Sequence, residues 1–163
     1  MLRVGIITVS DRSARGERPD ASGPALWKRI VAEGWQVTRQ AVVPDELSVL
    51  QQILVEWADA GDCDVILTTG GTGFSPRDIT PEATQAVITR AAPGLAEAMR
   101  HASLQVTPHA MLSRAVAGLR ARSILINLPG SPRGALENLE VILPVLPHAV
   151  QLLQEDPQAE AGH

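Results

Sequence analysis

Three short apolar runs constrain the fold more strongly than any other feature of this chain. They read VGIITV at 4–9, DVILT at 64–68 and SILINL at 123–128. Each run is nearly continuous and rich in β-branched residues, which is the pattern of a strand buried on both faces of a parallel sheet. Helical patterns lie between the runs, so the sequence predicts an α/β domain with right-handed crossovers.

A weaker strand is predicted at 35–43, where apolar and polar residues alternate. The N-caps expected for three of the helices are Ser22, Asp45 and Thr80. The helices themselves are expected at 24–33, 45–60, 80–92, 95–104 and 133–143, with a last helical segment reaching Leu153.

Residues 108–122 have a mixed pattern that allows a short helical piece. No repeat or linker divides the chain. We therefore expect a single domain over 1–153, followed by a polar tail over 154–163.

Composition limits the classes of protein to which the chain can belong. The 163 residues are 45% hydrophobic and 20% charged, which fits one soluble domain with its own core. The formal net charge of −4 argues against nucleic-acid binding, because no basic stripe is present to neutralise a phosphate backbone. No apolar run approaches the roughly 20 residues of a membrane span. The single Cys63 fits a reducing cytoplasm, where we expect the protein to act.

Small and hydroxyl residues follow each of the three buried strands. The sequences at these points are TVSD at 8–11, TTGGTG at 68–73 and NLPGS at 127–131. Because the carboxyl ends of parallel strands meet at one edge of a sheet, these segments are expected to lie together and to form the ligand site. Their hydroxyl and backbone N–H groups suit an anionic ligand.

The glycine-rich segment TTGGTGFSPRDITPEAT at 68–84 predicts a phosphate site. It does not match two common nucleotide motifs. A P-loop would need a lysine where Phe74 stands, and a dinucleotide fingerprint would need a third glycine where Pro76 stands.

Asp45 and Asp78 are the candidate catalytic acids, because two carboxylates can share a hydrated Mg²⁺ with phosphates. Each has a structural alternative: Asp45 as a helix N-cap, and Asp78 as the ion-pair partner of a neighbouring arginine such as Arg77. Arg77 and Arg133 are candidates for neutralising phosphate charge, with a solvated surface arginine as the equal alternative for each.

Six blocks in order resemble the MogA/MoaB family of molybdenum-cofactor biosynthesis proteins. These blocks are TVSD, VPDE, TTGGTGFSPRDITPEAT, PGLAEAMR, MLSRA and INLPGSP. The resemblance implies a three-layer α/β/α sandwich around a mostly parallel sheet, usually assembled as a homotrimer. It also implies a molybdopterin adenylyltransferase, which moves AMP from ATP to the phosphate of molybdopterin with Mg²⁺ and releases pyrophosphate. The molybdate insertase is a further partner that it suggests.

The resemblance also assigns roles to residues. The family's two essential aspartates, which would hold the metal, match Asp45 and Asp78. Its substrate-contacting positions match Thr8, Ser10, Asp11, Gly70, Gly71, Thr72, Gly73, Ser113, Pro129, Gly130 and Ser131.

Two other functions remain open from the sequence. One is a MoaB-type protein that binds molybdopterin or acts as a scaffold without adenylyltransferase activity. The other is a generic nucleotide-binding α/β domain. The apolar helix positions Leu95, Met99, Leu104, Leu139 and Leu143 fit either the core or a subunit interface, since periodicity does not separate the two.

Overall fold

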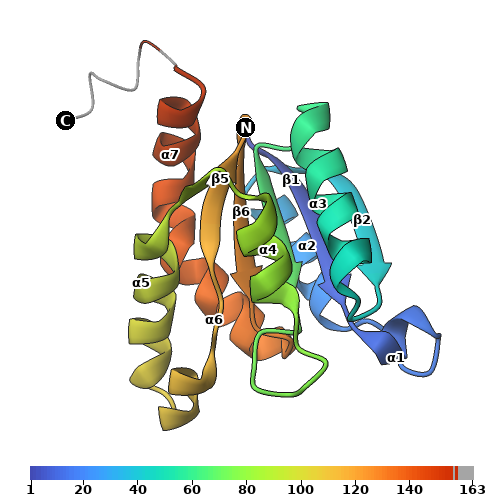
Figure 1. The fold of residues 1–163 in the computed structure, drawn as a ribbon. Coiled ribbons are helices and arrows are strands. Elements are labelled where there is room, and N and C mark those ends of the chain that lie inside the picture. Colours follow the sequence, from blue (N-terminus) through green and yellow to red (C-terminus); the bar gives the residue numbers. More distant parts are fainter. Residues whose placement is uncertain (156, 158–163) are drawn as a thin grey trace.

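The computed structural model describes residues 1–155 and 157, so most of the predicted polar tail over 154–163 lies outside the described residues. The described chain contains one six-stranded sheet (Figure 1). Its strands are β1 (Arg3–Val9), β2 (Gln36–Val43), β3 (Val65–Thr69), β4 (Arg90–Ala91), β5 (Ala117–Arg120) and β6 (Ser123–Leu128).

The sheet has the order β2-β1-β3-β6-β5-β4 and is mostly parallel. Parallel pairs join β1 to β2, β1 to β3, and β3 to β6, whereas β5 is antiparallel to both of its neighbours. The chain moves from β1 outward to β2 and then returns to the other side of β1 as β3. The sheet therefore has its topological switch point between β1 and β3, where open α/β folds bind ligands.

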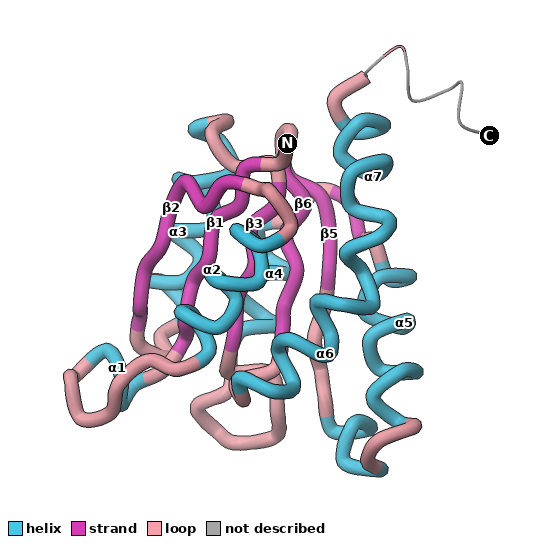
Figure 2. The backbone as a smooth tube through the Cα atoms, turned by 180° about the vertical axis from the view of Figure 1, so that it is seen from behind, coloured by secondary structure: helices cyan, strands magenta, loops and turns pink. Residues whose placement is uncertain are grey.

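Helices cover both faces of this sheet and complete the predicted three-layer sandwich (Figures 1 and 2). One face carries α3 (Leu47–Ala60) and α4 (Thr80–Val87), and the other carries α2 (Ser22–Ala32) and α6 (Pro132–Ile142). The remaining helical elements are α1 (Asp11–Ala14), α5 (Pro93–Leu104), α7 (Leu146–Leu153) and the 3₁₀ turns η1 (Pro108–Leu112) and η2 (Leu143–Val145).

Each face of the sheet has its own hydrophobic core. Alternate residues of a strand point to opposite faces, so Ile6 packs with the α2, α5 and α6 side, whereas Ile7 packs with the α3 and α4 side. Met99 and Leu139 are buried in the first of these cores, while Leu104 is 39% exposed. Among the described residues, no helix is long and apolar enough to cross a membrane.

The predicted caps of three helices are wrong. Ser22 lies inside α2, and the carboxylate of Asp20 instead accepts the N–H of Gly23 at 3.1 Å. Asp45 stands outside α3, which begins at Leu47, and Thr80 is the first residue of α4 rather than its cap. For Asp45 and Thr80, a tertiary contact of the side chain replaces the local capping bond.

The sequence also failed to predict the antiparallel edge of the sheet. The helix predicted over 80–92 ends at Val87, and the chain then forms β4. Strand β4 pairs with β5, which lies in the region 108–122 whose sequence pattern is mixed. Strand β5 has four residues, two of them alanine and glycine. A strand this short, half of it alanine and glycine, has no clear strand period, and pairing with β6 decides its conformation.

Candidate active site

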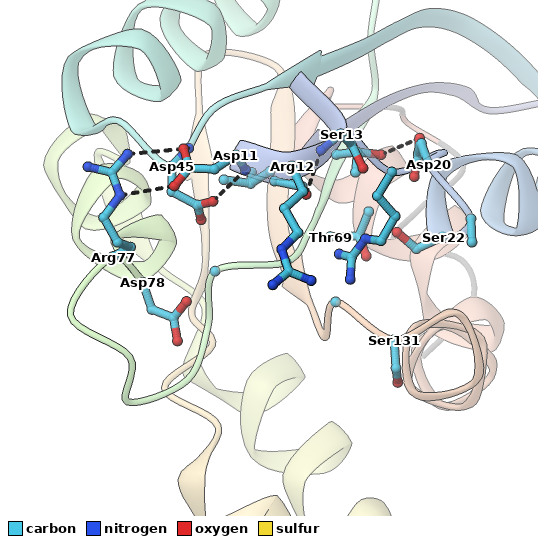
Figure 3. Close-up of a pocket in the computed structure, with 18 of the residues that line it drawn as sticks. Asp11, Arg12, Ser13, Asp20, Ser22, Asp45, Thr69, Arg77, Asp78 and Ser131 are labelled. Carbon is cyan, nitrogen blue, oxygen red and sulfur yellow. Dashed lines mark hydrogen bonds and ion pairs between the residues drawn. The ribbon is translucent and has the colours of Figure 1, made fainter. Parts of the chain in front are cut away.

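A cleft of about 1080 Å³ opens at the carboxyl ends of β1, β3 and β6, at the predicted switch-point edge. The loops after β1, β2 and β3 and the start of α6 form its walls (Figure 3). The lining residues include Thr8, Ser10, Asp11, Arg12, Arg18, Asp20, Asp45, Thr69, Gly70, Gly71, Arg77, Asp78, Gly130 and Ser131.

Asp11 and Asp45 join two walls of this cleft by a reciprocal pair of hydrogen bonds. The backbone N–H of Asp11 donates to Oδ2 of Asp45 at 2.9 Å, and the N–H of Asp45 donates to Oδ1 of Asp11 at 3.0 Å. The carboxylate of Asp45 is thus held by α1 instead of capping α3, which overturns the capping alternative for this residue.

Arg77 reaches across the cleft from the loop after β3 to Asp11 (Figure 3). Its Nε and Nη2 atoms donate to the two carboxylate oxygens, both at 3.0 Å. This bidentate contact lowers the pKa of the Asp11 carboxyl. The sequence-based alternative that paired Arg77 with Asp78 is therefore wrong, and Asp78 is left without a cationic partner among the described residues.

Asp45 lies in a different electrostatic environment. Burial raises the pKa of its carboxyl, and repulsion from Asp11 and Asp78 acts in the same direction, although the N–H of Asp11 opposes both effects. Asp45 and Asp78 both line the same cleft. A cation placed between them would relieve this repulsion.

Two glycines in left-handed conformations bring the loop after β3 close to the acids. Gly70 has φ +105° and Gly71 has φ +68°. A Cβ at Gly70 would overlap the carbonyl of Val9, while one at Gly71 would lie 3.0 Å from Oδ1 of Asp45. Side chains at these positions would therefore separate the loops that form the cleft.

Buried hydroxyl and amide groups fix this turn from behind. The Thr80 hydroxyl donates to the carbonyl of Gly70 at 2.9 Å. The side-chain amide of Asn127 donates to the hydroxyls of Thr68 and Thr84, both at 2.9 Å. These bonds connect β6, β3 and α4 below the cleft, so a buried hydrogen-bond network supports the glycine turn.

Arg114 holds the segment that carries Asp78. Its Nε donates to the carbonyl of Gly73 at 2.7 Å, and its Nη2 donates to the carbonyl of Asp78 at 2.9 Å. The same guanidinium forms an ion pair with Glu82 of α4. One planar group thus contacts both ends of the loop over 73–78 and limits where the carboxylate of Asp78 can lie.

The donor set fits a divalent cation of the Mg²⁺ type. Oδ2 of Asp45 accepts the N–H of Asp11, and Oδ2 of Asp78 accepts the N–H of Ser75 at 3.1 Å. The Oδ1 atoms of both aspartates accept no hydrogen bond from the residues that the structure describes. Mg²⁺ is commonly bound through one or two such carboxylate oxygens, with substrate phosphates and water completing its shell.

The structure brings most of the predicted site residues to one cleft. Nine of them line it: Thr8, Ser10, Asp11, Asp45, Gly70, Gly71, Asp78, Gly130 and Ser131. Four do not: Thr72, Gly73, Ser113 and Pro129. Each of these four makes a contact within the protein instead; for example, the carbonyl of Pro129 accepts the hydroxyl of Thr69 at 2.6 Å, and the Ser113 hydroxyl accepts the N–H of Ala115 at 3.3 Å.

Sequence reasoning missed several polar residues of the cleft. Arg12 and Arg18 line it from the segment between β1 and α2, where the sequence predicted only a polar loop. Arg114 was missed as the contact that fixes the loop of Asp78. Arg133, a predicted phosphate contact, is paired with Glu137 and does not line the cleft. Only the position of Arg12 directly after the TVSD block gave a signal.

Residues 5–148 match the protein family described as "Probable molybdopterin binding domain". The chain belongs to this family. Among solved structures, this member of the family is similar to the molybdopterin biosynthesis enzyme MoaB of Thermus thermophilus, with 51% identity and a TM-score of 0.90 over 96% of this chain and 99% of that chain. It is also similar to the molybdopterin biosynthesis Mog protein of Mycobacterium ulcerans, with 37% identity and a TM-score of 0.87 over 94% and 99% of the two chains.

Curated relatives give a consistent result for this family member. The molybdopterin adenylyltransferase of Escherichia coli K12 is 38% identical over 99% of this chain and 89% of the relative. The molybdopterin adenylyltransferase of Helicobacter pylori 26695 is 39% identical over 93% and 88%. Gephyrin of Dictyostelium discoideum is 43% identical over 96% of this chain, which spans 23% of that longer protein.

Proposed function

We propose that this protein is a molybdopterin adenylyltransferase that transfers AMP from ATP to the phosphate of molybdopterin. The observation that carries the proposal is the placement of Asp45 and Asp78 in one cleft beside the glycine turn. Each has one carboxylate oxygen that accepts no hydrogen bond from the described residues. The near full-length likeness to adenylyltransferases of two bacteria supports it.

The chemistry needs little covalent help from the protein. An oxygen of the substrate's phosphate monoester forms a bond to the α-phosphorus of ATP. The bond between that phosphorus and the α,β-bridging oxygen breaks, and its electron pair leaves with pyrophosphate. A phosphate monoester is already largely ionised at neutral pH. The reaction therefore requires positioning and charge neutralisation more than a general base.

The residues of the cleft supply these requirements. Asp45 and Asp78 would hold the cation, which when bound neutralises charge on the reacting phosphates. The turn at Gly70 and Gly71 lets backbone approach the anionic substrates closely. The hydrogen bonds of Asp11 to Asp45, and of Arg114 to the backbone of Asp78, keep the two carboxylates in position before substrate arrives.

Pyrophosphate release from ATP tests the proposal directly. The full chain is incubated with ATP and Mg²⁺, with and without molybdopterin, and pyrophosphate is measured. We expect release that depends on both molybdopterin and Mg²⁺. ATP turnover without molybdopterin dependence would favour a generic nucleotide-binding enzyme and would contradict the proposal.

A second candidate is a MoaB-type molybdopterin-binding protein without adenylyltransferase activity. The 51% identity to the MoaB of Thermus thermophilus favours it. This candidate predicts molybdopterin binding with no pyrophosphate release. The same experiment, combined with a direct molybdopterin binding measurement, separates the two functions.

A homotrimer in the cytoplasm, with the molybdate insertase as a further partner, completes the proposal. Trp27 and Val31 of α2 are 42% and 44% exposed, and they provide apolar surface for a contact between subunits. Light scattering at micromolar concentration tests this assembly, and a monomer would contradict it.

A further inference from the structure

The segment between β1 and α2 directs two arginines at the cleft. Arg12 and Arg18 both line it, and both side chains are exposed. Figure 3 shows Arg12 extending into the middle of the cleft, with Asp78 on one side and Ser131 on the other. Neither arginine side chain forms a hydrogen bond or an ion pair with any residue that the structure describes.

Most other arginines of the protein are paired, including those close to these two in the chain or in space. Arg15 lies between them in sequence and forms an ion pair with Glu17 at 2.8 Å. Arg77, on the opposite wall, is paired with Asp11. The cleft thus contains two arginines, Arg12 and Arg18, whose guanidinium groups donate no hydrogen bond to any described residue. Both are nevertheless close in sequence to acidic residues.

The two acids near Arg18 in sequence are already occupied, Glu17 by Arg15 and Asp20 by two other donors. Oδ2 of Asp20 accepts the hydroxyl of Thr8 at 2.8 Å, and Oδ1 accepts the N–H of Gly23 at 3.1 Å. Asp20 therefore stabilises the start of α2 and leaves Arg18 available. Asp11 is likewise bound by Arg77 through both of its oxygens, which leaves the adjacent Arg12 available.

The cleft consequently has charges of two kinds. Asp45 and Asp78 present carboxylate oxygens suited to a cation, whereas Arg12 and Arg18 present guanidinium groups suited to an anion. A nucleoside triphosphate needs both kinds of charge. A cation held by Asp45 and Asp78 would neutralise charge at the reacting phosphate, and the β- and γ-phosphates carry further negative charge. Arginine binds phosphate oxygens through two parallel N–H groups.

We propose that Arg12 and Arg18 form a pyrophosphate subsite, which binds the β- and γ-phosphates of the nucleotide and then the released pyrophosphate. The inference rests on the proposed adenylyl transfer and identifies where the leaving group is held. Negative charge accumulates on pyrophosphate as the bond to the α-phosphorus breaks, so two guanidinium groups at this position stabilise the departing group. Their exposure on a surface segment suits a product that has to leave.

Binding of inorganic pyrophosphate tests the subsite without requiring turnover. Isothermal titration calorimetry is performed on the full chain with pyrophosphate, and separately with phenyl phosphate as a probe for a monoester. Arg12→Gln and Arg18→Gln should each weaken pyrophosphate binding about tenfold, the scale of one charge-assisted contact. Phenyl phosphate affinity should change less than about threefold, because these arginines contact only the leaving group.

Two control variants remove the same charge elsewhere. Arg15→Gln changes the same segment but removes an arginine that is paired and does not line the cleft. Arg122→Gln removes an exposed arginine outside the cleft. Both controls should retain wild-type pyrophosphate affinity, and thermal melts should show all four variants folded.

The proposal is overturned if wild-type protein does not bind pyrophosphate, or if the controls weaken binding as much as the cleft variants do. It is also overturned if phenyl phosphate binding is lost while pyrophosphate binding persists, because the arginines would then hold the substrate monoester. Failure of the adenylyltransferase assay with intact pyrophosphate binding would instead contradict the proposed function alone.

Discussion

Asp11 and Asp45 each accept the backbone N–H of the other, at 3.0 and 2.9 Å, and so connect the loop after β1 to the loop after β2. The two carboxylates have opposite shifts in pKa. The bond from Arg77 lowers the pKa of Asp11, whereas burial raises the pKa of Asp45. One aspartate is therefore a stable anionic anchor, and the other is a desolvated carboxylate available to a cation.

Replacing the anchor should loosen the site before it unfolds the protein. Asp11→Ala removes the acceptor of the Asp45 N–H and the partner of Arg77, so we expect a loss of about 1–2 kcal/mol in the free energy of unfolding, measured by urea denaturation. Pyrophosphate release should fall further than Arg77→Gln lowers it, because that variant keeps the bond between Asp11 and Asp45. Equal activity in the two variants would contradict an anchoring role for this bond.

Asp78→Asn tests the proposed metal ligand. The amide keeps the shape of the side chain but removes the charge, so the fold should persist and pyrophosphate release should fall at least ~10²-fold, the scale of one preorganised electrostatic element. Asp59→Asn is a matched control, since Asp59 pairs with Arg120 away from the cleft. Near-normal turnover in Asp78→Asn would remove this residue from the site.

Gly71→Ala should separate the effect of backbone strain from that of crowding. An alanine here would be strained because the backbone at position 71 has a positive φ. Its Cβ would also lie 2.5 Å from the Thr80 hydroxyl and close to Oδ1 of Asp45. Gly34→Ala is the control, because Gly34 also has positive φ but faces open space. We expect about 1–2 kcal/mol of destabilisation from strain in both variants, and an additional loss of stability and activity in Gly71→Ala alone. Equal losses in the two variants would show that crowding at Gly71 has no effect.

Arg114→Lys should show that the fork of the arginine, rather than its charge, fixes the loop of Asp78. A lysine cannot donate simultaneously to the carbonyls of Gly73 and Asp78 in the same geometry. We expect the apparent affinity for Mg²⁺ and the turnover number to fall together. Glu82→Gln removes only the partly exposed ion pair and should cost at most about 1 kcal/mol of stability. A larger effect in Glu82→Gln than in Arg114→Lys would refute this assignment.

Asp64 provides a pH-dependent contribution to stability. Burial alone would raise the pKa of its carboxyl, but hydrogen bonds from Arg3 and Gln154 outweigh burial and lower the pKa below its ordinary value of 3.8. A lowered pKa in the folded state stabilises the protein fully above the ordinary value, and that contribution is lost as the pH falls through the folded-state value. Wild type should therefore exceed Asp64→Asn in unfolding free energy at pH 7, and the difference should shrink below about pH 4. A difference that is constant from about pH 7 to about pH 2 would contradict this.

The sequence predicted the central strands of the sheet well, because their burial on both faces allows only one position in the fold. The runs that became β1, β3 and β6 are apolar on both faces, so only a central strand between two helical layers satisfies them. It predicted the antiparallel edge poorly, because β4 and β5 are short and owe their conformation to pairing. Two of the helix caps failed because Asp45 and Thr80 use their side chains in tertiary contacts.

By itself, the sequence determined that TVSD, the glycine segment and NLPGS would meet at one edge of a parallel sheet, since strand direction fixes where strand ends lie. Only the tertiary structure decided which charges face each other there. Arg77 pairs with Asp11 rather than with its neighbour Asp78, and Arg12 and Arg18 remain unpaired in the cleft among the described residues. Side-chain pairing depends on distances between loops that are far apart in the chain, and the linear order of residues does not contain those distances.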